Sequence, residues 1–289
     1  MKFYIVDVFA ESRYEGNQLA VFMPEEPLTE RLMQQIAREV NFAETTFIMP
    51  GRQGGGEYKV RIFSPAAELP FAGHPTLGTA YIIDSILQPG SSSLILHLPV
   101  GPIRVERIRD QWWMEQNQPL LGTVLPGRKQ AASVLQLKED DLISDLPVQF
   151  VSTGLPSVIL PLASVEALSR CLVDHSQFRL FLEQQAQANI VAFARAEEGS
   201  ADTLRVRCFI NEPGYQEDSA TGSANGNLAA YLIEHQYFGQ SHLINYTVLQ
   251  GLEMGRPSRL AVQCGKTEGL YTIRVGGRVV PVASGEWLL

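Results

Sequence analysis

Alternation of apolar and polar residues is the main pattern along the N-terminal part of the chain. In several short segments apolar and polar residues alternate, and turn residues bound each segment, which is typical of strands. We expect strands at residues 3–9, 19–23, 58–63, 93–98 and 103–107. Most of the chain is therefore predicted to form β-structure.

Two segments show the spacing of helices instead. An amphipathic helix is predicted over residues 29–40, with Asn41 as its stop. The apolar residues of this helix are Leu32, Met33, Ile36, Ala37 and Val40. The segment after Pro75, residues 76–83, carries no charged side chain for two turns. Such a helix is expected to be surrounded by protein on all sides.

The second half of the chain repeats the first. Residues 61–63, Glu68 and the pair Gly73-His74 precede the apolar helix. Their counterparts before a second apolar helix are residues 207–209, Glu217 and Gly222-Ser223. The glutamate stands five residues before the glycine in both copies, and residues 16–21 match residues 154–159 more loosely. A repeat this long fits a duplicated domain, each copy being strands around one central helix.

Prolines and glycines between residues 119 and 127 interrupt the pattern, so we place the domain boundary near residue 120. The predicted domains are residues 1–120 and 121–277, with residues 278–289 expected to pack back on the first. The fold class is α+β, with two pseudo-symmetric half-domains that each wrap a curled sheet around an apolar helix.

Composition excludes several classes of protein. Apolar residues make up 45% of the 289 residues and charged residues 19%, as in ordinary globular proteins. A net charge of −8 without a basic stripe disfavours nucleic acid as a partner. The chain shows neither a signal-like N-terminus nor an apolar stretch of about 18 residues, so we expect a cytoplasmic protein without membrane contact. Three widely spaced cysteines indicate reduced, structural thiols.

Two glycine turns that feed the apolar helices are candidate binding elements. We expect Pro75 at the first helical position after Gly73-His74, and Ser223 as the N-cap after Gly222. Each turn alone is interpreted as an ordinary helix cap. As a symmetric pair they favour a ligand site, in which free N–H groups hold a carboxylate.

Glu44 is the candidate acid and base. It follows the first helix among apolar and small residues, and a partly desolvated carboxyl there would have a raised pKa and work near neutral pH. His74 is a candidate proton donor or substrate partner. Asp218 is most simply a turn or capping residue, with a catalytic role as the alternative. The histidines and cysteines lack metal-ligand spacing, so we expect no metal and no cofactor.

Seven segments resemble the PhzF family of phenazine-biosynthesis isomerase-like proteins. They follow the family order across nearly the whole chain. They are residues 7–9, 16–22 (GNQLAVF), 41–47 (NFAETTF), 61–65, 68–78 (ELPFAGHPTLG), 217–224 (EDSATGSA) and 249–258. Small departures from the common family wording are Gln18, Ala43 and Ser219.

The resemblance implies the diaminopimelate-epimerase-like fold, an active site between the halves and a homodimer. It also implies that Glu44 is the catalytic acid/base, with His74 and Asp218 also catalytic. Ser223 and the backbone of Gly73 and Gly222 would contact the substrate. Related racemases use two cysteines where this chain has His74 and Ser223, so a two-thiol mechanism is excluded.

The reaction of the type member is the cofactor-independent isomerisation of trans-2,3-dihydro-3-hydroxyanthranilate. We therefore expect an isomerase that shifts a proton on a small carboxylate. In the type reaction this carboxylate is cyclic and carries amino or hydroxy substituents. One alternative is an epimerase or racemase of a small amino or hydroxy acid, with Asp218 or His74 as a second base. The other is a non-catalytic protein that binds small molecules.

Overall fold

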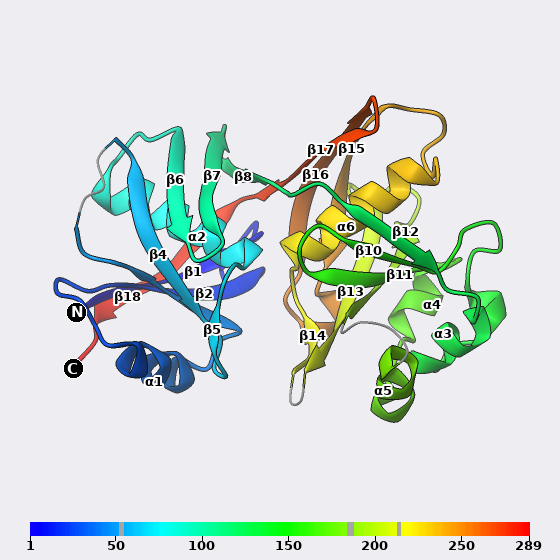
Figure 1. Ribbon diagram of the computed structural model, residues 1–289, viewed down its shortest axis with the longest axis horizontal. Coiled ribbons are helices and arrows are strands. Elements are labelled where there is room, and N and C mark those ends of the chain that lie inside the picture. The colour runs from blue at the N-terminus through cyan, green and yellow to red at the C-terminus, as the bar shows by residue number, and fades with distance from the viewer. Residues whose placement is uncertain (52–54, 184–187, 213–214) are drawn as a thin grey trace. The chain divides into compact units, whose positions relative to one another are not determined.

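The chain folds into two compact units, seen in a computed structural model that describes residues 1–51, 55–183, 188–212 and 215–289 (Figure 1). The first half comprises Met1–Glu115 together with Gly276–Leu289, and the second half comprises Gln116–Val275. The C-terminal segment lies beside the N-terminus, where the Met1 amino group donates a 3.0 Å hydrogen bond to the Trp287 carbonyl.

Among its described residues, the first half contains nine strands. They are β1 (Lys2–Val8), β2 (Asn17–Met23), β3 (Glu44–Ile48), β4 (Glu57–Phe63), β5 (Glu68–Leu69), β6 (Ser93–Leu98), β7 (Gly101–Ile108), β8 (Gln111–Glu115) and β18 (Val279–Glu286). Strand β1 lies between β18 and β2, antiparallel to both, and β2 runs parallel to β3. Strand β4 is antiparallel to β3 and β5 and parallel to β6, which continues antiparallel into β7 and β8.

The second half repeats this order of parallel and antiparallel pairs. Its strands are β9 (Leu120–Val124), β10 (Gln149–Ser152), β11 (Pro156–Pro161), β12 (Asn189–Arg195), β13 (Leu204–Glu212), β14 (Tyr215–Asp218), β15 (Leu243–Gln250), β16 (Ser258–Thr267) and β17 (Leu270–Gly277). Strand β10 is antiparallel to β9 and β11, and β11 is parallel to β12. Strand β13 is antiparallel to β12 and β14 and parallel to β15. The predicted α+β class with pseudo-symmetric halves is confirmed.

One helix lies at the centre of each half: α2 (Gly73–Ile82) in the first and α6 (Gly222–Glu234) in the second. Nearly every residue of both helices is buried, as their lack of charge predicted. A π-helical turn, Ile83–Leu87, extends α2. Figure 1 shows α2 among the strands of the first half and α6 among those of the second.

The remaining helices cover outer faces. Helix α1 (Glu30–Val40) confirms the predicted amphipathic helix: the Thr29 hydroxyl accepts a bond from the Leu32 N–H, and Asn41 ends the helix at φ 55°. The second half carries α3 (Arg128–Val134), α4 (Val165–Ser169) and α5 (His175–Glu183), with 3-10 turns at Glu139–Asp141 and Leu252–Met254. Their apolar residues form a core with one face of β11 and β12.

Two details of the glycine turns differ from the prediction. Helix α2 begins at Gly73 and α6 at Gly222, so Pro75 is the third helical residue and Ser223 the second. The residues at the N-cap positions are Ala72 and Thr221, and neither makes a side-chain capping bond. Both glycines adopt helical geometry and extend the helix backwards. Pro75 is tolerated because the first-turn N–H groups need no intrahelical partner.

The three cysteines are free and buried, which confirms their interpretation as structural thiols. Burial raises the pKa of Cys171 and of Cys264 to about 12, so both stay protonated at neutral pH. Across the described part of the chain, no helix is both long and apolar enough to cross a membrane.

Candidate active site

Helix α2 packs closely against β1 and β2, strands of the same sheet as β3, which carries Glu44. A Cβ atom on Gly78 would be 2.6 Å from the Leu19 side chain on β2 and 2.8 Å from that of Val8 on β1, so any larger residue would displace these side chains. One residue further, the Thr79 hydroxyl donates a 2.9 Å hydrogen bond to the Thr46 hydroxyl on β3. The helix is thereby fixed in position against β1, β2 and β3.

This packing brings Glu44 and His74 together. Glu44 is the first residue of β3 and is paired with Leu19 of β2. It points to the same side of the sheet as Thr46, toward α2, because side chains alternate along a strand. His74 precedes Gly78 by one helical turn and shares its face of α2. As a result, His74 Nε2 lies 3.3 Å from Glu44 Oε2.

The His74–Glu44 pair is largely withdrawn from water. The His74 side chain is 5% exposed and that of Glu44 is 18% exposed. Burial lowers the pKa of His74 to about 3, and a hydrogen bond from the ring to the Gln18 carbonyl opposes this shift only in part. His74 is therefore a neutral imidazole at physiological pH, and the proton chemistry of this pair rests with the carboxyl group.

In the second half, a buried network fixes Asp218. Asp218 ends β14, and the Thr221 hydroxyl donates a 2.5 Å bond to its Oδ2. The Gln250 side chain donates to the Asp218 backbone carbonyl at 2.8 Å and to the Thr221 hydroxyl at 3.1 Å. Asn225 in turn donates to Gln250 Oε1 at 2.9 Å. The carboxyl of Asp218 is thus held beside the start of α6.

The predicted site residues form two groups, one in each half. Glu44, His74 and Gly73 gather at the start of α2, and Asp218, Gly222 and Ser223 gather at the start of α6. Ser223 is 7% exposed and Asp218 is 8% exposed. The catalytic and binding roles assigned to these residues remain predictions.

Several residues around the site residues were not predicted, among them Gln18, Thr221, Gln250 and Asn225. The Gln18 carbonyl binds His74, and the sequence gives no signal for it because the contact uses the backbone. Gln250 lies in one of the family-like segments, and Asn225 is a fully buried polar residue of an apolar helix. A polar side chain within an otherwise apolar helix would have pointed to Asn225.

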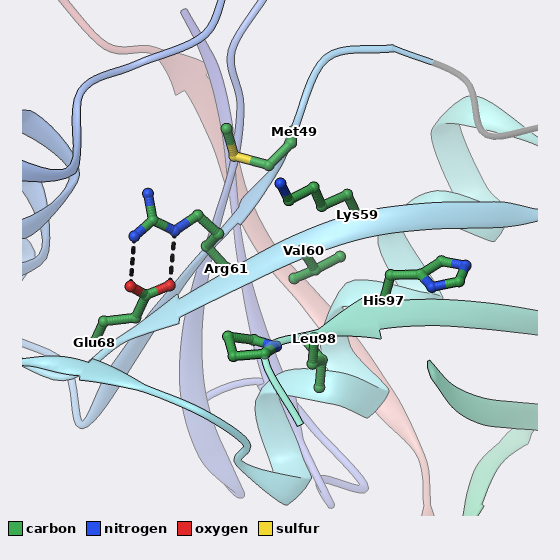
Figure 2. Close-up of a pocket in the computed structure, with 8 residues that line it drawn as sticks. Met49, Lys59, Val60, Arg61, Glu68, His97 and Leu98 are labelled. Carbon is green, nitrogen blue, oxygen red and sulfur yellow. Dashed lines mark hydrogen bonds and ion pairs between the residues drawn. The ribbon is translucent and has the colours of Figure 1, made fainter. Parts of the chain in front are cut away.

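A separate depression of about 500 Å3 lies on the first half (Figure 2). It is lined by Met49, Lys59, Val60, Arg61, Glu68, His97, Leu98 and Pro99. Figure 2 shows Arg61 and Glu68, from neighbouring strands, facing each other and joined by two hydrogen bonds. Neither Glu44 nor His74 lines this depression. Met49 directly follows the end of β3 and stands five residues from Glu44, about 16 Å at the usual rise of a strand.

The geometry and the motifs agree with the comparison to known families. The family model for phenazine biosynthesis-like proteins, PhzC-PhzF, matches residues 6–285. The chain belongs to this family. A trans-2,3-dihydro-3-hydroxyanthranilate isomerase of Pseudomonas fluorescens is 36% identical over 293 residues, with 99% of each chain covered. Curated relatives at this level of identity are isomerases, and so is this PhzF-family chain.

Solved structures agree on the fold. A PhzF-family protein of Bacillus anthracis matches with a TM-score of 0.92 at 25% identity, covering 100% of this chain and 99% of the other. A probable proline racemase of Agrobacterium radiobacter K84 matches with a TM-score of 0.63 at 10% identity, covering 100% of this chain and 93% of the other. The second likeness concerns the fold alone. Together they confirm the diaminopimelate-epimerase-like class.

Proposed function

We propose that this PhzF-family isomerase moves a proton between two carbons of a small cyclic carboxylate, with Glu44 as the acid and base. The observation that carries the proposal is the buried contact between Glu44 and a neutral His74. The substrate class follows from relatives that act on trans-2,3-dihydro-3-hydroxyanthranilate. Asp218, Ser223 and the backbone of Gly73 and Gly222 are proposed to bind the polar groups of the substrate.

The repeat supports one base rather than two. Residue 19 corresponds to residue 157 in the two copies, and these two are the strand partners of Glu44 and Asn189, respectively. Asn189 is therefore the second-half counterpart of Glu44, as Ser223 is of His74. Neither an amide nor a hydroxyl titrates near neutral pH, so neither can serve as a second base. This favours a single-base proton shift over an epimerase that uses equivalent bases from both halves.

In the proposed reaction, the Glu44 carboxylate removes a proton from one ring carbon. The C–H bond breaks, an O–H bond forms on Glu44, and the electron pair remains in the conjugated system of the substrate. Glu44 then returns the proton at another carbon of that system, and the double bonds shift. A base positioned in this way contributes about 10²–10⁴-fold to the rate.

The test is incubation with dihydrohydroxyanthranilate in D₂O, followed by absorbance and by NMR. The native protein is expected to convert the substrate and incorporate deuterium. The Glu44→Gln variant should lose about 10²-fold or more of this rate. Deuterium at a stereocentre without migration of a double bond would instead indicate an epimerase. Binding without exchange would favour a non-catalytic protein.

A matched control exists in the same half. Glu57 Oε2 lies 2.8 Å from His97 Nε2, a closer contact than that between Glu44 and His74. The side chains of Glu57 and His97 are 38% and 33% exposed, however, so solvent screens this pair. Glu57→Gln should leave deuterium exchange unchanged. A comparable loss in both variants would contradict a specific role for Glu44.

A further inference from the structure

The two ring nitrogens of His74 have different environments. Nε2 faces Glu44 and has no hydrogen-bond partner among the residues that the structure describes. The Gln18 carbonyl binds the ring and therefore contacts Nδ1. A carbonyl oxygen can only accept a hydrogen bond, so Nδ1 must carry a proton.

The ring has no second proton to offer. An imidazolium at a site that is 5% exposed would lose most of its hydration, so the ring stays neutral at physiological pH. With its one proton on Nδ1, Nε2 presents a bare lone pair to Glu44. An ionised Glu44 oxygen 3.3 Å from this lone pair would be repelled by it. The contact becomes favourable when the Glu44 oxygen carries a proton.

We propose that the Gln18 carbonyl fixes His74 in the neutral Nδ1–H tautomer, and that His74 Nε2 accepts a hydrogen bond from the protonated form of Glu44. His74 then stabilises the form of Glu44 that holds the proton in transit, while its own protonation state is unchanged. Gln18 acts through its backbone and is a positioning residue. The statement about the proton in transit rests on the proposed function, whereas the statement about the tautomer does not.

Several local features keep this arrangement in place. Strand β2, which carries Gln18, is paired on both sides, with β1 and with β3. Gly16 precedes it at φ 68°, and a Cβ atom there would lie 2.3 Å from the Val8 carbonyl. The turn that leads into Gln18 is thus restricted to glycine. Helix α2 is fixed by Gly78 and Thr79, so neither partner of the His74 ring can shift easily.

The tautomer can be measured without any substrate. Protein labelled with nitrogen-15 at histidine gives long-range proton–nitrogen spectra that distinguish the tautomers, and the signals of His74 among the 5 histidines are identified by their loss in His74→Asn. We expect one protonated Nδ1 and one bare Nε2 at pH 7. The Nε2–H tautomer or an imidazolium would overturn the proposal. Gln18→Ala keeps the carbonyl and should leave this spectrum unchanged.

A pair of variants tests the role of Nε2. The amide of His74→Asn can still bind the Gln18 carbonyl but is too short to reach Glu44, whereas the amide of His74→Gln reaches the Nε2 position. If the acceptor at Nε2 matters, His74→Gln should exchange deuterium at least about tenfold faster than His74→Asn. Equal rates would overturn the second part of the proposal. If the native protein exchanges deuterium but His74 has the other tautomer, this inference is refuted and the proposed function stands.

Discussion

The two halves share one strand order but differ in the chemistry at equivalent positions. Glu44 and His74 in the first half correspond to Asn189 and Ser223 in the second. Five residues into each central helix, Gly78 allows close contact with the strands, whereas Asn227 accepts bonds from the Thr153 N–H and hydroxyl at 2.7 and 2.9 Å. At the positions of Glu44 and His74, the first copy thus holds titratable groups and the second holds neutral hydrogen-bonding groups, whereas Asp218 of the second half stands at a different position.

An ion pair that is common to both copies is buried to different degrees in the two halves. Arg61 binds Glu68 through two nitrogens, and Arg207 binds Glu217 in the same way. Each guanidinium also stacks on the phenylalanine two residues further on. The Arg61 side chain is 19% exposed and lines the depression in Figure 2, whereas that of Arg207 is 8% exposed. Arg207 also donates to the Leu168 and Cys171 carbonyls at 3.1 and 3.0 Å.

Breaking the two ion pairs should give the largest difference between the halves. Arg207→Met leaves the Glu217 carboxylate and three backbone carbonyls without this donor, and should cost about 3–5 kcal/mol of unfolding free energy. Arg61→Met should cost about 1 kcal/mol, because water reaches Glu68 and the partner Glu30 is 70% exposed. Urea unfolding of both variants measures these losses.

The two halves can be followed separately in that experiment. All 3 tryptophans, Trp112, Trp113 and Trp287, lie in the first half, so their fluorescence follows its unfolding, while circular dichroism follows both. Arg207→Met should shift the circular dichroism transition more than the fluorescence transition if the halves unfold separately. Equal losses of unfolding free energy in the two variants would show that burial does not determine how much each ion pair contributes to stability.

A turn found in the second half gives the next largest effect. Gly251 adopts φ 79°, and a Cβ atom there would lie 2.4 Å from the Arg256 carbonyl and 2.6 Å from the Ser219 carbonyl. Gly251→Ala should cost about 3 kcal/mol, from left-handed strain and from displacement of this backbone. Because Ser219 follows Asp218, we also expect weaker substrate binding, measured as a higher KM with a smaller change in kcat.

Gly255, in the same turn, is the matched control. It adopts φ 67° and has open space where a Cβ atom would be. Gly255→Ala should therefore show only the strain, about 1 kcal/mol, with an unchanged KM. The same KM in both variants would show that Gly251 does not position Asp218.

Much of this architecture could be predicted because it depends on local pattern. The amphipathic spacing predicts α1 and its stop at Asn41, and the lack of charge after Pro75 indicates a buried α2. The repeat identifies Arg61, Glu68 and their counterparts, although it does not show that they form ion pairs. Sequence similarity supplies the family, and thereby the choice of Glu44.

The contacts that matter most to the candidate site could not be predicted, because they join distant segments. The contact between His74 and the Gln18 carbonyl depends on how closely α2 approaches β2. Every residue has a backbone carbonyl, so the sequence does not show which one binds His74. The starts of α2 and α6 were predicted up to two residues late. Proline and serine are common at helix starts, but Gly73 and Gly222 continue the helical geometry backwards.

The remaining prediction concerns the pH dependence of stability, and it separates His74 from its neutral counterpart Ser223. The pKa of His74 is lowered from 6.5 to about 3 by burial. Above pH 6.5 the ring is neutral in both the folded and the unfolded chain. As the pH falls below 6.5 the unfolded chain takes up a proton that the folded chain refuses, so the unfolded state is favoured and stability is lost toward pH 3.

Between pH 7 and pH 5 this linkage should remove about 2 kcal/mol from the unfolding free energy of the first half. Tryptophan fluorescence in urea at the two pH values measures it, with His74→Asn as reference because the other titrating groups are shared. The native protein should lose about 2 kcal/mol more than the variant. A difference that does not change with pH would mean that the folded ring accepts protons, and His74 could then not present a bare Nε2 to Glu44. Because Ser223 does not titrate and Ser223→Ala retains His74, the stability difference between the native protein and Ser223→Ala should not change with pH.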